Sequence, residues 1–413
     1  MPKYHIWTIG CQMNKAESER LGSCFEELGY QATDAAAEAD LIVLNSCVVR
    51  QSAESRIINK LHNLKQLKKA KPDMIIAVTG CLVNSEVDRL KKDFPHVDHF
   101  FKPGDYPPWL ESAESAPPLP RHPSPGVYVP IIQGCDNFCA YCIVPYRRGR
   151  ERSRKIPEIT CEVRELVHRG AREVTLLGQN VDSYGHDLPG KPDLADLLTE
   201  LNDINGLARL RFLTNHPKDM SLKLIEAIAS LDKVCEHITL PVQSGSDDIL
   251  KAMRRGYTVA QYRQLITQIR RHVPGAALST DVIVGFPSES DRQFQQTVDL
   301  LSETKFDTVH VAAYSPRPGT IAARELEDNI PLPEKRGRLS KIEQLQEKIA
   351  TEINAQLLDR TVEVLAEGKT RGKWHGRTRT DKLVFFNSNN DCLGQLVKIR
   401  VDRTSPWSLQ GKV

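Results

Sequence analysis

The sequence predicts an α/β protein in three parts: an open parallel α/β sheet, an open barrel of six βα units, and a small antiparallel β-barrel. Three observations predict this order. Short apolar runs alternate with helical periodicity through the first and middle parts of the chain. A proline-rich stretch separates those two parts. Short strand-like runs with turn residues between them fill the end of the chain.

The first part, residues 1–102, contains three apolar runs separated by two helical patterns. The runs are Tyr4–Thr8, Leu41–Asn45 and Met74–Thr79, and the helical patterns are Asn14–Leu28 and Ser52–Lys69. The last two runs are continuous, as is typical of parallel strands buried on both faces, so we expect an open parallel sheet. Residues 103–125 then hold eight prolines, which predicts a semi-rigid linker.

The middle part, residues 126–358, repeats a strand and a helix six times. Because a closed barrel of this kind needs eight units, six predict an open, partial TIM barrel. The candidate strands are Val127–Gln133, Glu173–Leu177, Ala208–Leu213, His237–Pro241, Leu278–Val284 and Thr308–Ala313. Helical segments between the strands are Glu158–Arg169, Asp193–Asp203, Ser221–Ser230, Val259–Arg271 and Asp291–Thr304, and a charged helical run follows the last strand at about Leu332–Leu358.

The last part, residues 359–413, shows short runs separated by turn residues, which predicts a small antiparallel β-barrel. The runs are Thr361–Ala366, Leu383–Asn387, Gln395–Val401 and Trp407–Val413.

Composition is that of an ordinary soluble protein, with 40% hydrophobic and 26% charged residues and a formal net charge of +3. No run approaches the ~18–20 apolar residues of a membrane span, and the N-terminus lacks the apolar core of a signal peptide. We therefore expect a cytoplasmic protein with no membrane partner, in a compartment that keeps thiols reduced. No heptad pattern demands a dimer, so a monomer is expected.

Ten cysteines in such a protein indicate metal binding or catalysis rather than disulfides. Cys135, Cys139 and Cys142 have the spacing C-x3-C-x2-C just beyond the first barrel strand, on the rim where βα barrels carry active sites. Three thiolates can bind three corners of a 4Fe-4S cluster and leave one iron open. Zinc is the alternative, but it prefers four ligands, and no fourth Cys or His has the expected spacing.

A second set of cysteines consists of Cys11, Cys47 and Cys81, each a few residues at most after a predicted strand of the first part. The ends of parallel strands meet at one edge of an open sheet, where ligands bind, so these thiols are expected to come together. The alternative is three buried thiols that never meet. The remaining cysteines lack any partner spacing and are interpreted as packing residues: Cys24, Cys161, Cys235 and Cys392.

The segment from Gly134 to Arg154 resembles the methylthiotransferases of the radical S-adenosylmethionine superfamily. The resemblance implies that the open iron of the cluster on Cys135, Cys139 and Cys142 binds S-adenosylmethionine. The reduced cluster would then cleave it to methionine and a 5′-deoxyadenosyl radical, which makes these cysteines the catalytic candidates. The resemblance also implies a second 4Fe-4S cluster on Cys11, Cys47 and Cys81, whose open iron holds the sulfur for the product. Residues expected to support that cluster are Asn14, Asn45 and Arg50.

Loops after the barrel strands also resemble those of the family, and all of them fall on the rim that carries the cluster. The candidates for binding S-adenosylmethionine are Gln243, Arg254, Asp281 and Gly285. A glycine such as Gly285 would let the backbone approach the adenine.

Cations interleaved with aromatic residues suit phosphate contacts and base stacking. They follow the cysteine loop and recur in the last part, which resembles a TRAM domain and so favours an RNA partner. The candidate RNA-binding residues are Arg147, Arg148, Arg150, Lys369, Arg371, Lys373, Trp374 and Arg377.

Three motifs resemble the branch of the family that acts on N6-dimethylallyladenosine in tRNA: Cys11–Asn14, Gly178–Val181 and His216–Lys218. The implied function is transfer of a methylthio group to carbon 2 of that adenosine, next to the anticodon. The implied partners are the tRNA anticodon loop and an electron donor of the flavodoxin or ferredoxin type. Two alternatives stay open: a methylthiotransferase for another substrate (threonylcarbamoyl-adenosine tRNA or a ribosomal protein), and a non-catalytic iron–sulfur RNA-binding protein.

Overall fold

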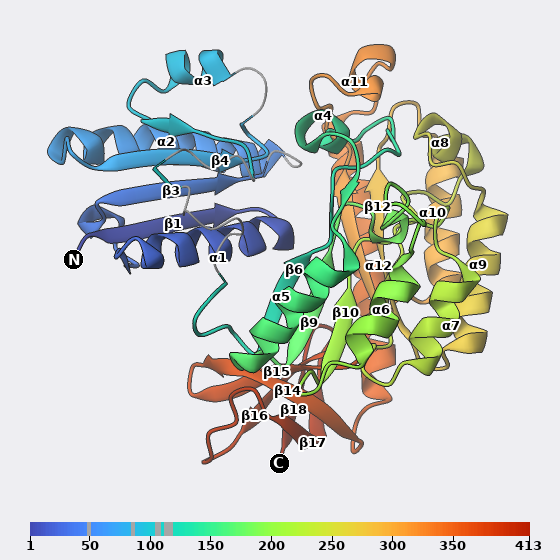
Figure 1. Ribbon diagram of the computed structural model, residues 1–413. Helices are drawn as coiled ribbons and strands as arrows, with labels where there is room; N and C mark the ends of the chain where they lie inside the picture. Colours follow the sequence, from blue (N-terminus) through green and yellow to red (C-terminus); the bar gives the residue numbers. More distant parts are fainter. Residues whose placement is uncertain (48–50, 84–86, 104–108, 111–118) are drawn as a thin grey trace. The chain divides into compact units, whose positions relative to one another are not determined.

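The chain forms two units in the computed structural model, which describes residues 1–47, 51–83, 87–103, 109–110 and 119–413 (Figure 1). The first unit is Met1–His122 together with Cys142–Arg150, and the second is Pro123–Tyr141 together with Glu151–Val413. The chain therefore leaves the second unit at Cys142 and returns to it at Glu151. Each unit is described by itself below.

A five-stranded parallel sheet in the order β2-β1-β3-β4-β5 forms the first unit. Its strands are β1 Lys3–Ile9, β2 Gln31–Ala32, β3 Leu41–Ser46, β4 Ile75–Gly80 and β5 His99–Phe100. Its helices are α1 Gln12–Glu27, α2 Gln51–Ala70 and α3 Val87–Asp93, with α4 Val144–Arg148 in the returning segment. The predicted open parallel sheet is confirmed. The strands β2 and β5 were not predicted, because two-residue strands carry no periodicity, and the seven-residue helix α3 was not predicted either.

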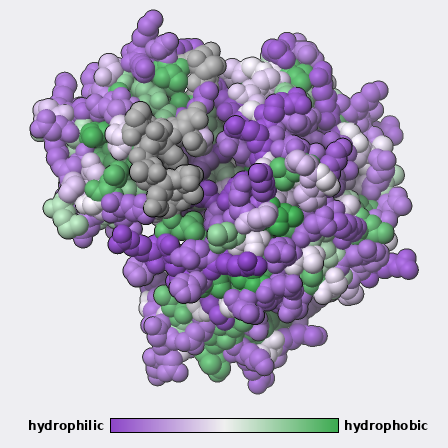
Figure 2. All heavy atoms as spheres, in the orientation of Figure 1, coloured by the Kyte–Doolittle hydropathy of each residue, from purple (hydrophilic) through white to green (hydrophobic). Residues whose placement is uncertain are grey.

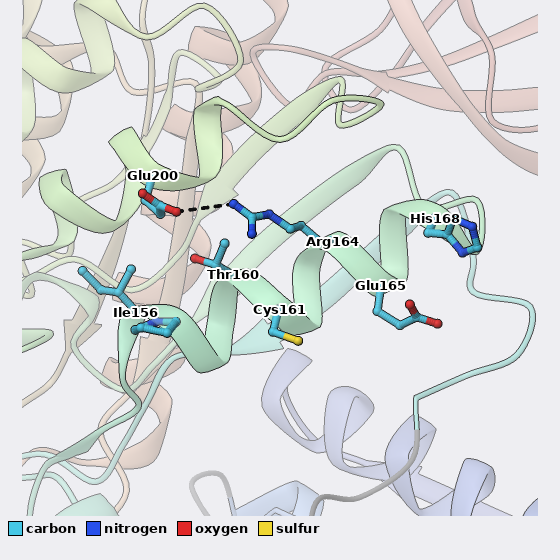
Figure 3. Close-up of a pocket in the computed structure, with 8 residues that line it drawn as sticks. Ile156, Thr160, Cys161, Arg164, Glu165, His168 and Glu200 are labelled. Atoms are coloured by element: carbon cyan, nitrogen blue, oxygen red, sulfur yellow. Dashed lines mark ion pairs between the residues drawn. The ribbon is translucent and has the colours of Figure 1, made fainter.

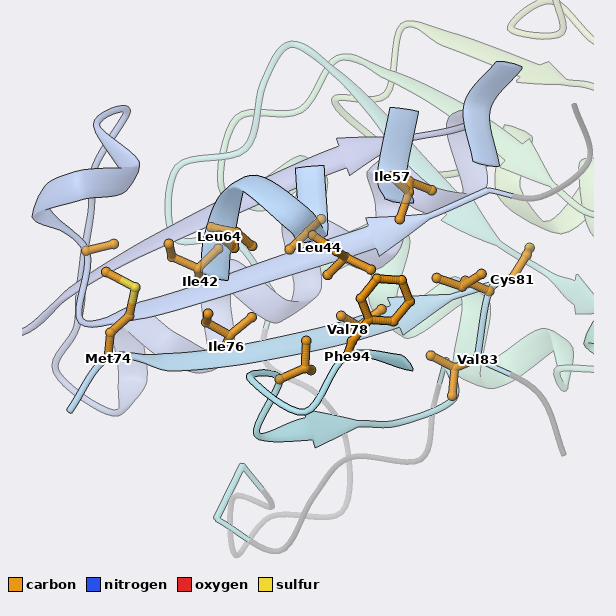
Figure 4. Packing of buried hydrophobic residues seen from close by; sticks show 14 residues of the cluster. Ile42, Leu44, Ile57, Leu64, Met74, Ile76, Val78, Cys81, Val83 and Phe94 are labelled. Atoms are coloured by element: carbon orange, nitrogen blue, oxygen red, sulfur yellow. The ribbon is translucent and has the colours of Figure 1, made fainter. Parts of the chain in front are cut away.

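Apolar side chains of β3 and β4 pack against α2 to form one core of this sheet (Figure 4). Ile42 and Leu44 from β3 and Ile76 and Val78 from β4 are at most 1% exposed. Cys81 lies at the end of this apolar row, just after β4 (Figure 4). On the other face, Phe25 of α1 stacks on Trp109, with ring centroids 6.5 Å apart. Trp109 of the predicted linker thus packs within the first unit.

Six parallel barrel strands and their helices form most of the second unit, in the sheets β10-β9-β6 and β11-β12-β13. An isolated parallel bridge pairs Leu210 with Val234, which precedes the first strand of the second sheet. The strands are β6 Gly126–Pro130, β9 Glu173–Leu177, β10 Arg209–Phe212, β11 His237–Thr239, β12 Ala277–Val284 and β13 Thr308–Ala313. The helices are α5 Ile156–His168, α6 Leu194–Asn202, α7 Leu222–Ser230, α8 Asp247–Ala252, α9 Val259–His272, α10 Asp291–Thr304, α11 Ile321–Glu325 and α12 Leu332–Ala355. The predicted open barrel of six units is confirmed.

A closed five-stranded barrel in the order β14-β15-β16-β18-β17 completes the second unit, and it departs from the predicted antiparallel barrel at one pair, β16 and β18, which run parallel. Its strands are β14 Thr361–Thr370, β15 Lys373–Thr378, β16 Leu383–Asn387, β17 Leu396–Thr404 and β18 Leu409–Lys412. Strand β15 was not predicted, because its sequence alternates cations with Trp374, Gly376 and Thr378. These three residues are buried, while the residues between them are not. The alternation is that of a strand with one buried face.

Two buried arginines at the start of β10 attach this small barrel to the central one. Arg209 donates to the backbone oxygens of Arg377 (2.7 Å) and Glu363 (3.2 Å). Arg211 donates to those of Arg379 (2.8 Å) and Thr378 (2.6 Å). The small barrel therefore packs at the N-terminal ends of the barrel strands, opposite the loops that follow them (Figure 1).

Polar residues cover most of the surface seen in Figure 2, and the hydrophobic residues form small separate spots. Within the described residues, no helix has the length and apolar character needed to cross a membrane.

Candidate functional site

The ends of three neighbouring strands bring Cys11, Cys47 and Cys81 to one edge of the first sheet. Ile9, Ser46 and Gly80 lie in one row across β1, β3 and β4, and each cysteine follows that row by one or two residues. The backbone N–H of Cys81 donates to Ser46 O at 2.7 Å, which ties two of the ends together. A Cβ on Gly10 would lie 2.9 Å from the Cys47 Cβ, so only glycine allows the chain before Cys11 to pass so close.

A buried amide network supports this edge. Asn14, which is fully buried, donates through Nδ2 to Asn45 Oδ1 at 2.7 Å and to Ser46 O at 3.1 Å. Asn45 returns a bond to Asn14 O at 2.8 Å. Cys11 is the N-cap of α1 and lies 3.3 Å from Asn14 Oδ1 through its sulfur. Arg50, the third residue expected here, lies outside the described residues.

Arg148 brings a cation to the same edge. Its Nε donates to the Cys81 sulfur at 3.3 Å and its Nη1 to Glu17 Oε1 at 2.7 Å, and its side chain is only 4% exposed. Burial raises the pKa of the Cys81 thiol to about 11, while Arg148 opposes that rise. The prediction that Arg148 contacts RNA is wrong, because the guanidinium is buried and points at a cysteine and a carboxylate.

Three thiols at one edge of the sheet are a donor set that an iron–sulfur cluster takes. Within the described residues, no group of three or more His, Cys, Asp or Glu side chains is gathered to hold one ion. A cluster takes one thiolate on each of several irons, so its ligands lie farther apart than those of one ion. Arg148 Nη2 and Glu17 Oε2 are buried and lack a hydrogen-bond partner among the described residues, as expected where a polar group is missing.

The loop with Cys135 and Cys139 follows the first barrel strand, as predicted. The strands β7 Ile132–Gln133 and β8 Arg152–Ser153 pair at its base. Ala140 is held on both sides, since its N–H donates to Met253 O (2.9 Å) and its oxygen accepts from Ala322 N (2.7 Å). Cys135 and Cys139 are less than 10% exposed, and burial raises the pKa of Cys135 to about 11. Cys142 begins the segment that belongs to the first unit.

The buried arginine beside this loop is Arg255 and not the predicted Arg254. Arg255 donates through Nη1 to the Cys139 sulfur (3.4 Å), through Nη2 to Pro241 O (2.9 Å) and through Nε to the Tyr257 hydroxyl (3.1 Å). The Arg254 side chain is 53% exposed and pairs with Glu325 at 3.2 Å. Arg254 has a φ of +57°, so the backbone turns there and sends the two neighbouring side chains in different directions.

Of the other residues predicted to bind the cofactor, Gln243 and Gly285 follow the strands β11 and β12, whereas Asp281 lies within β12. Gln243 pairs with β12 through backbone bonds to Asp281 O (2.9 Å) and from Ile283 N (3.0 Å). Its Oε1 is buried and has no partner among the described residues, which suits a polar ligand. Gly285 has a φ of +66°, and a Cβ there would lie 2.4 Å from the Lys335 side chain. These two facts explain the glycine locally, so its contact with adenine stays a prediction.

His216, which follows β10, was noted in the sequence only as part of a motif. Burial and the charges of Arg255 and Lys218 lower the pKa of His216 to about 2, so its imidazole is neutral. Its Nδ1 accepts from Lys218 N at 3.2 Å, so Nε2 carries the proton. That N–H is buried and unpaired within the described chain. It is therefore a hydrogen-bond donor available to a ligand on the rim.

The remaining RNA candidates differ in exposure. Trp374 is 5% exposed and packs in the core of the small barrel, so the prediction that it stacks on bases is wrong. Arg377 pairs with Asp381 at 3.3 Å. Four other cations are exposed, and Arg147 is half-buried; the exposed ones are Arg150, Lys369, Arg371 and Lys373.

An open groove lies on the helical outside of the second unit (Figure 3). Arg164 of α5 and Glu200 of α6 form an ion pair across it at 3.6 Å. Cys161 is exposed on the outer face of α5, so the prediction that it is a packing residue is wrong. Because its lining comes from two outer helices and not from loops after strands, the groove is not part of the rim.

Comparisons with known proteins cover the whole chain. Family models match residues 3–102 (Uncharacterized protein family UPF0004), 129–301 (Radical SAM superfamily) and 358–413 (TRAM domain). A tRNA-2-methylthio-N(6)-dimethylallyladenosine synthase of Dehalococcoides mccartyi (strain CBDB1) is 56% identical over 413 residues, 100% of this chain and 99% of that protein. A protein of the same name from Chloroflexus aurantiacus is 50% identical over 423 residues, 99% of this chain and 91% of that protein.

Solved structures share the fold at low identity. The radical S-adenosylmethionine methyltransferase TsrM from Kitasatospora setae, with cobalamin and a [4Fe-4S] cluster bound, has a TM-score of 0.51 at 12% identity over 78% of this chain and 74% of that chain. The cobalamin-dependent S-adenosylmethionine radical enzyme OxsB has a TM-score of 0.51 at 13% identity over 97% of this chain and 65% of that chain.

Proposed function

This chain belongs to the family of tRNA-2-methylthio-N6-dimethylallyladenosine synthases, and from that membership we propose that it adds a methylthio group to carbon 2 of N6-dimethylallyladenosine beside the tRNA anticodon. It is a radical S-adenosylmethionine enzyme. The observation that carries the proposal is the match over the full length, which includes all three domains. A C–H bond on an adenine ring is inert toward polar reagents, so a radical route suits the reaction.

The enzyme carries two 4Fe-4S clusters in this proposal, one on Cys135, Cys139 and Cys142 and one held by the three N-terminal cysteines. The first cluster, when bound, supplies the electron that cleaves the sulfonium of S-adenosylmethionine. Both sets hold three thiols, which leaves one iron of each cluster for a small molecule. The buried, unpaired Arg148 Nη2 at one site and Gln243 Oε1 at the other support this assignment.

The surrounding residues bind and orient the cofactor and keep water out. Gln243 at the rim and Asp281 within β12 present polar groups, and the neutral His216 donates a hydrogen bond through Nε2. Arg255 holds Cys139 in place and stabilises its thiolate. Ala140 packs in an apolar cluster that shields the loop, together with Ile249, Met253, Phe286, Tyr314 and Ile321.

The tRNA is held by the small barrel while the target base reaches the rim. The two places lie at opposite ends of strands about 17 Å long, so one extended partner must contact both. Lys369, Arg371 and Lys373 are the exposed cations for phosphate contacts, with Arg147 and Arg150 in the first unit. An unpaired anticodon loop exposes its bases without the cost of melting a duplex. We also propose a flavodoxin- or ferredoxin-type electron donor, and a monomeric enzyme in the cytoplasm.

Mass spectrometry of tRNA nucleosides from a deletion strain tests the function. Loss of methylthiolated dimethylallyladenosine, restored by the gene on a plasmid, is the expected result, and unchanged levels would refute the substrate. Anaerobic reconstitution should yield about eight irons per chain, since each 4Fe-4S cluster holds four. With dithionite and S-adenosylmethionine, 5′-deoxyadenosine should form. No such product would favour the non-catalytic iron–sulfur protein instead.

A further inference from the structure

We propose that Arg148 is a positioning residue of the N-terminal cysteine site. Through its hydrogen bond to the Cys81 sulfur, Arg148 raises the reduction potential of the cluster bound there, and the negative charge of Glu17 reduces this effect. This inference rests on the two-cluster proposal above. It assigns a role in the first unit to a residue whose sequence context indicates RNA.

The contacts of Arg148 support this role. Its planar guanidinium offers five donors in one fork, and two of its nitrogens already have defined partners. Nε donates to the Cys81 sulfur at 3.3 Å and Nη1 to Glu17 Oε1 at 2.7 Å. Nη2 has no partner among the described residues, although it is buried. The fork therefore keeps a donor for a sulfur atom that only the filled site contains.

The charges explain the direction of the effect. Reduction adds one negative charge to the cluster, and a hydrogen bond from a cation becomes stronger as its acceptor becomes more negative. Arg148 therefore stabilises the reduced form more than the oxidised form. Glu17 is a carboxylate on the far side of the same guanidinium, with a side chain only 18% exposed, and its charge weakens that preference.

The alternative role of Arg148, binding an RNA phosphate, does not fit its surroundings. A phosphate-binding arginine needs a side chain open to solvent. The Arg148 side chain is instead buried, and it interacts electrostatically with Cys81, Glu17 and Cys11. Arg147 is half-buried and Arg150 is exposed, so Arg148 is the buried arginine among these three.

Redox titration of the N-terminal cluster alone tests the proposal. The parent is the full chain with Cys135, Cys139 and Cys142 replaced by alanine, reconstituted anaerobically, titrated with dithionite and followed by electron paramagnetic resonance. At the midpoint potential of the parent, Arg148→Met should lower the ratio of reduced to oxidised cluster about tenfold, which equals a shift of about −59 mV for a one-electron couple. Arg148→Lys keeps the charge but loses the fork, so its shift should be smaller.

Two further variants separate this role from a purely structural one. Glu17→Gln should raise the ratio, the opposite direction to Arg148→Met, whereas structural damage would move both variants the same way. Arg89→Met removes an exposed arginine of α3 in the same unit and should change nothing. An unchanged midpoint in Arg148→Met, or equal signs for Arg148→Met and Glu17→Gln, overturns the proposal. A parent that takes up no iron refutes the two-cluster proposal, and this inference falls with it; a parent that loads iron leaves only the role of Arg148 in question.

Discussion

Replacing Arg255 by methionine is expected to impair cleavage of S-adenosylmethionine far more than replacing its neighbour Arg254. Arg255 makes three hydrogen bonds from a buried position, one of them to the Cys139 sulfur at 3.4 Å. A hydrogen bond that involves a charged group contributes about 1.5–3 kcal/mol, so loss of the bond to a ligating thiolate should weaken the cluster-bound state about ten- to hundredfold. The other two bonds keep Pro241 and Tyr257 in place, and their loss adds to the effect.

The assay is 5′-deoxyadenosine formation with dithionite after anaerobic reconstitution, together with the iron retained after a chelator challenge. Arg254→Met is the matched control, since its ion pair with Glu325 joins two side chains that are each about half exposed. Such a pair contributes at most about 1 kcal/mol, which limits the loss to about fivefold. Wild-type rates and iron retention in Arg255→Met, or an equal loss in Arg254→Met, would refute the reasoning.

Four other substitutions have definite expected outcomes. Cys81→Ala should remove about four irons and abolish methylthiolation while 5′-deoxyadenosine still forms, since one cluster remains; iron analysis that shows no loss contradicts this. Trp374→Ala should lower the free energy of unfolding by about 3–5 kcal/mol because of the cavity it leaves, which urea unfolding measures. Arg371→Ala should leave stability unchanged and flatten the salt dependence of tRNA binding, which filter binding measures. Burial raises the pKa of Asp182 from 3.8 to about 7, so its contribution to stability is complete below about pH 4 and is lost as the pH rises to about 7. Asp182→Asn should flatten the fall in unfolding free energy across that range. A stability–pH profile identical to that of the wild type would contradict the raised pKa of Asp182.

Several features of the protein follow from the sequence alone, because they depend on neighbours along the chain. The period of apolar residues is a local property, and it predicts the parallel sheet of the first unit and the six βα units of the second. Cysteines placed after strands are local as well. Once the strands are parallel, their register brings Ile9, Ser46 and Gly80 into one row, so Cys11, Cys47 and Cys81 follow at one edge.

Only the tertiary structure decided which charged and aromatic side chains are buried. Arg254 and Arg255 are adjacent and chemically identical, and the positive φ of Arg254 separates an exposed ion pair from a buried contact with Cys139. Trp374 lies among cations, yet closure of the small barrel turns it into the core.

Arg148 belongs to a run of cations that indicates RNA, yet the return of its segment to the first unit buries it beside Cys81. The physical reason is the same in each case. Burial of a side chain depends on residues that are distant in sequence, and a cation can be buried only where distant acceptors satisfy it. The sequence shows which residues are cations, whereas only the fold shows which acceptors lie close enough to pair with them.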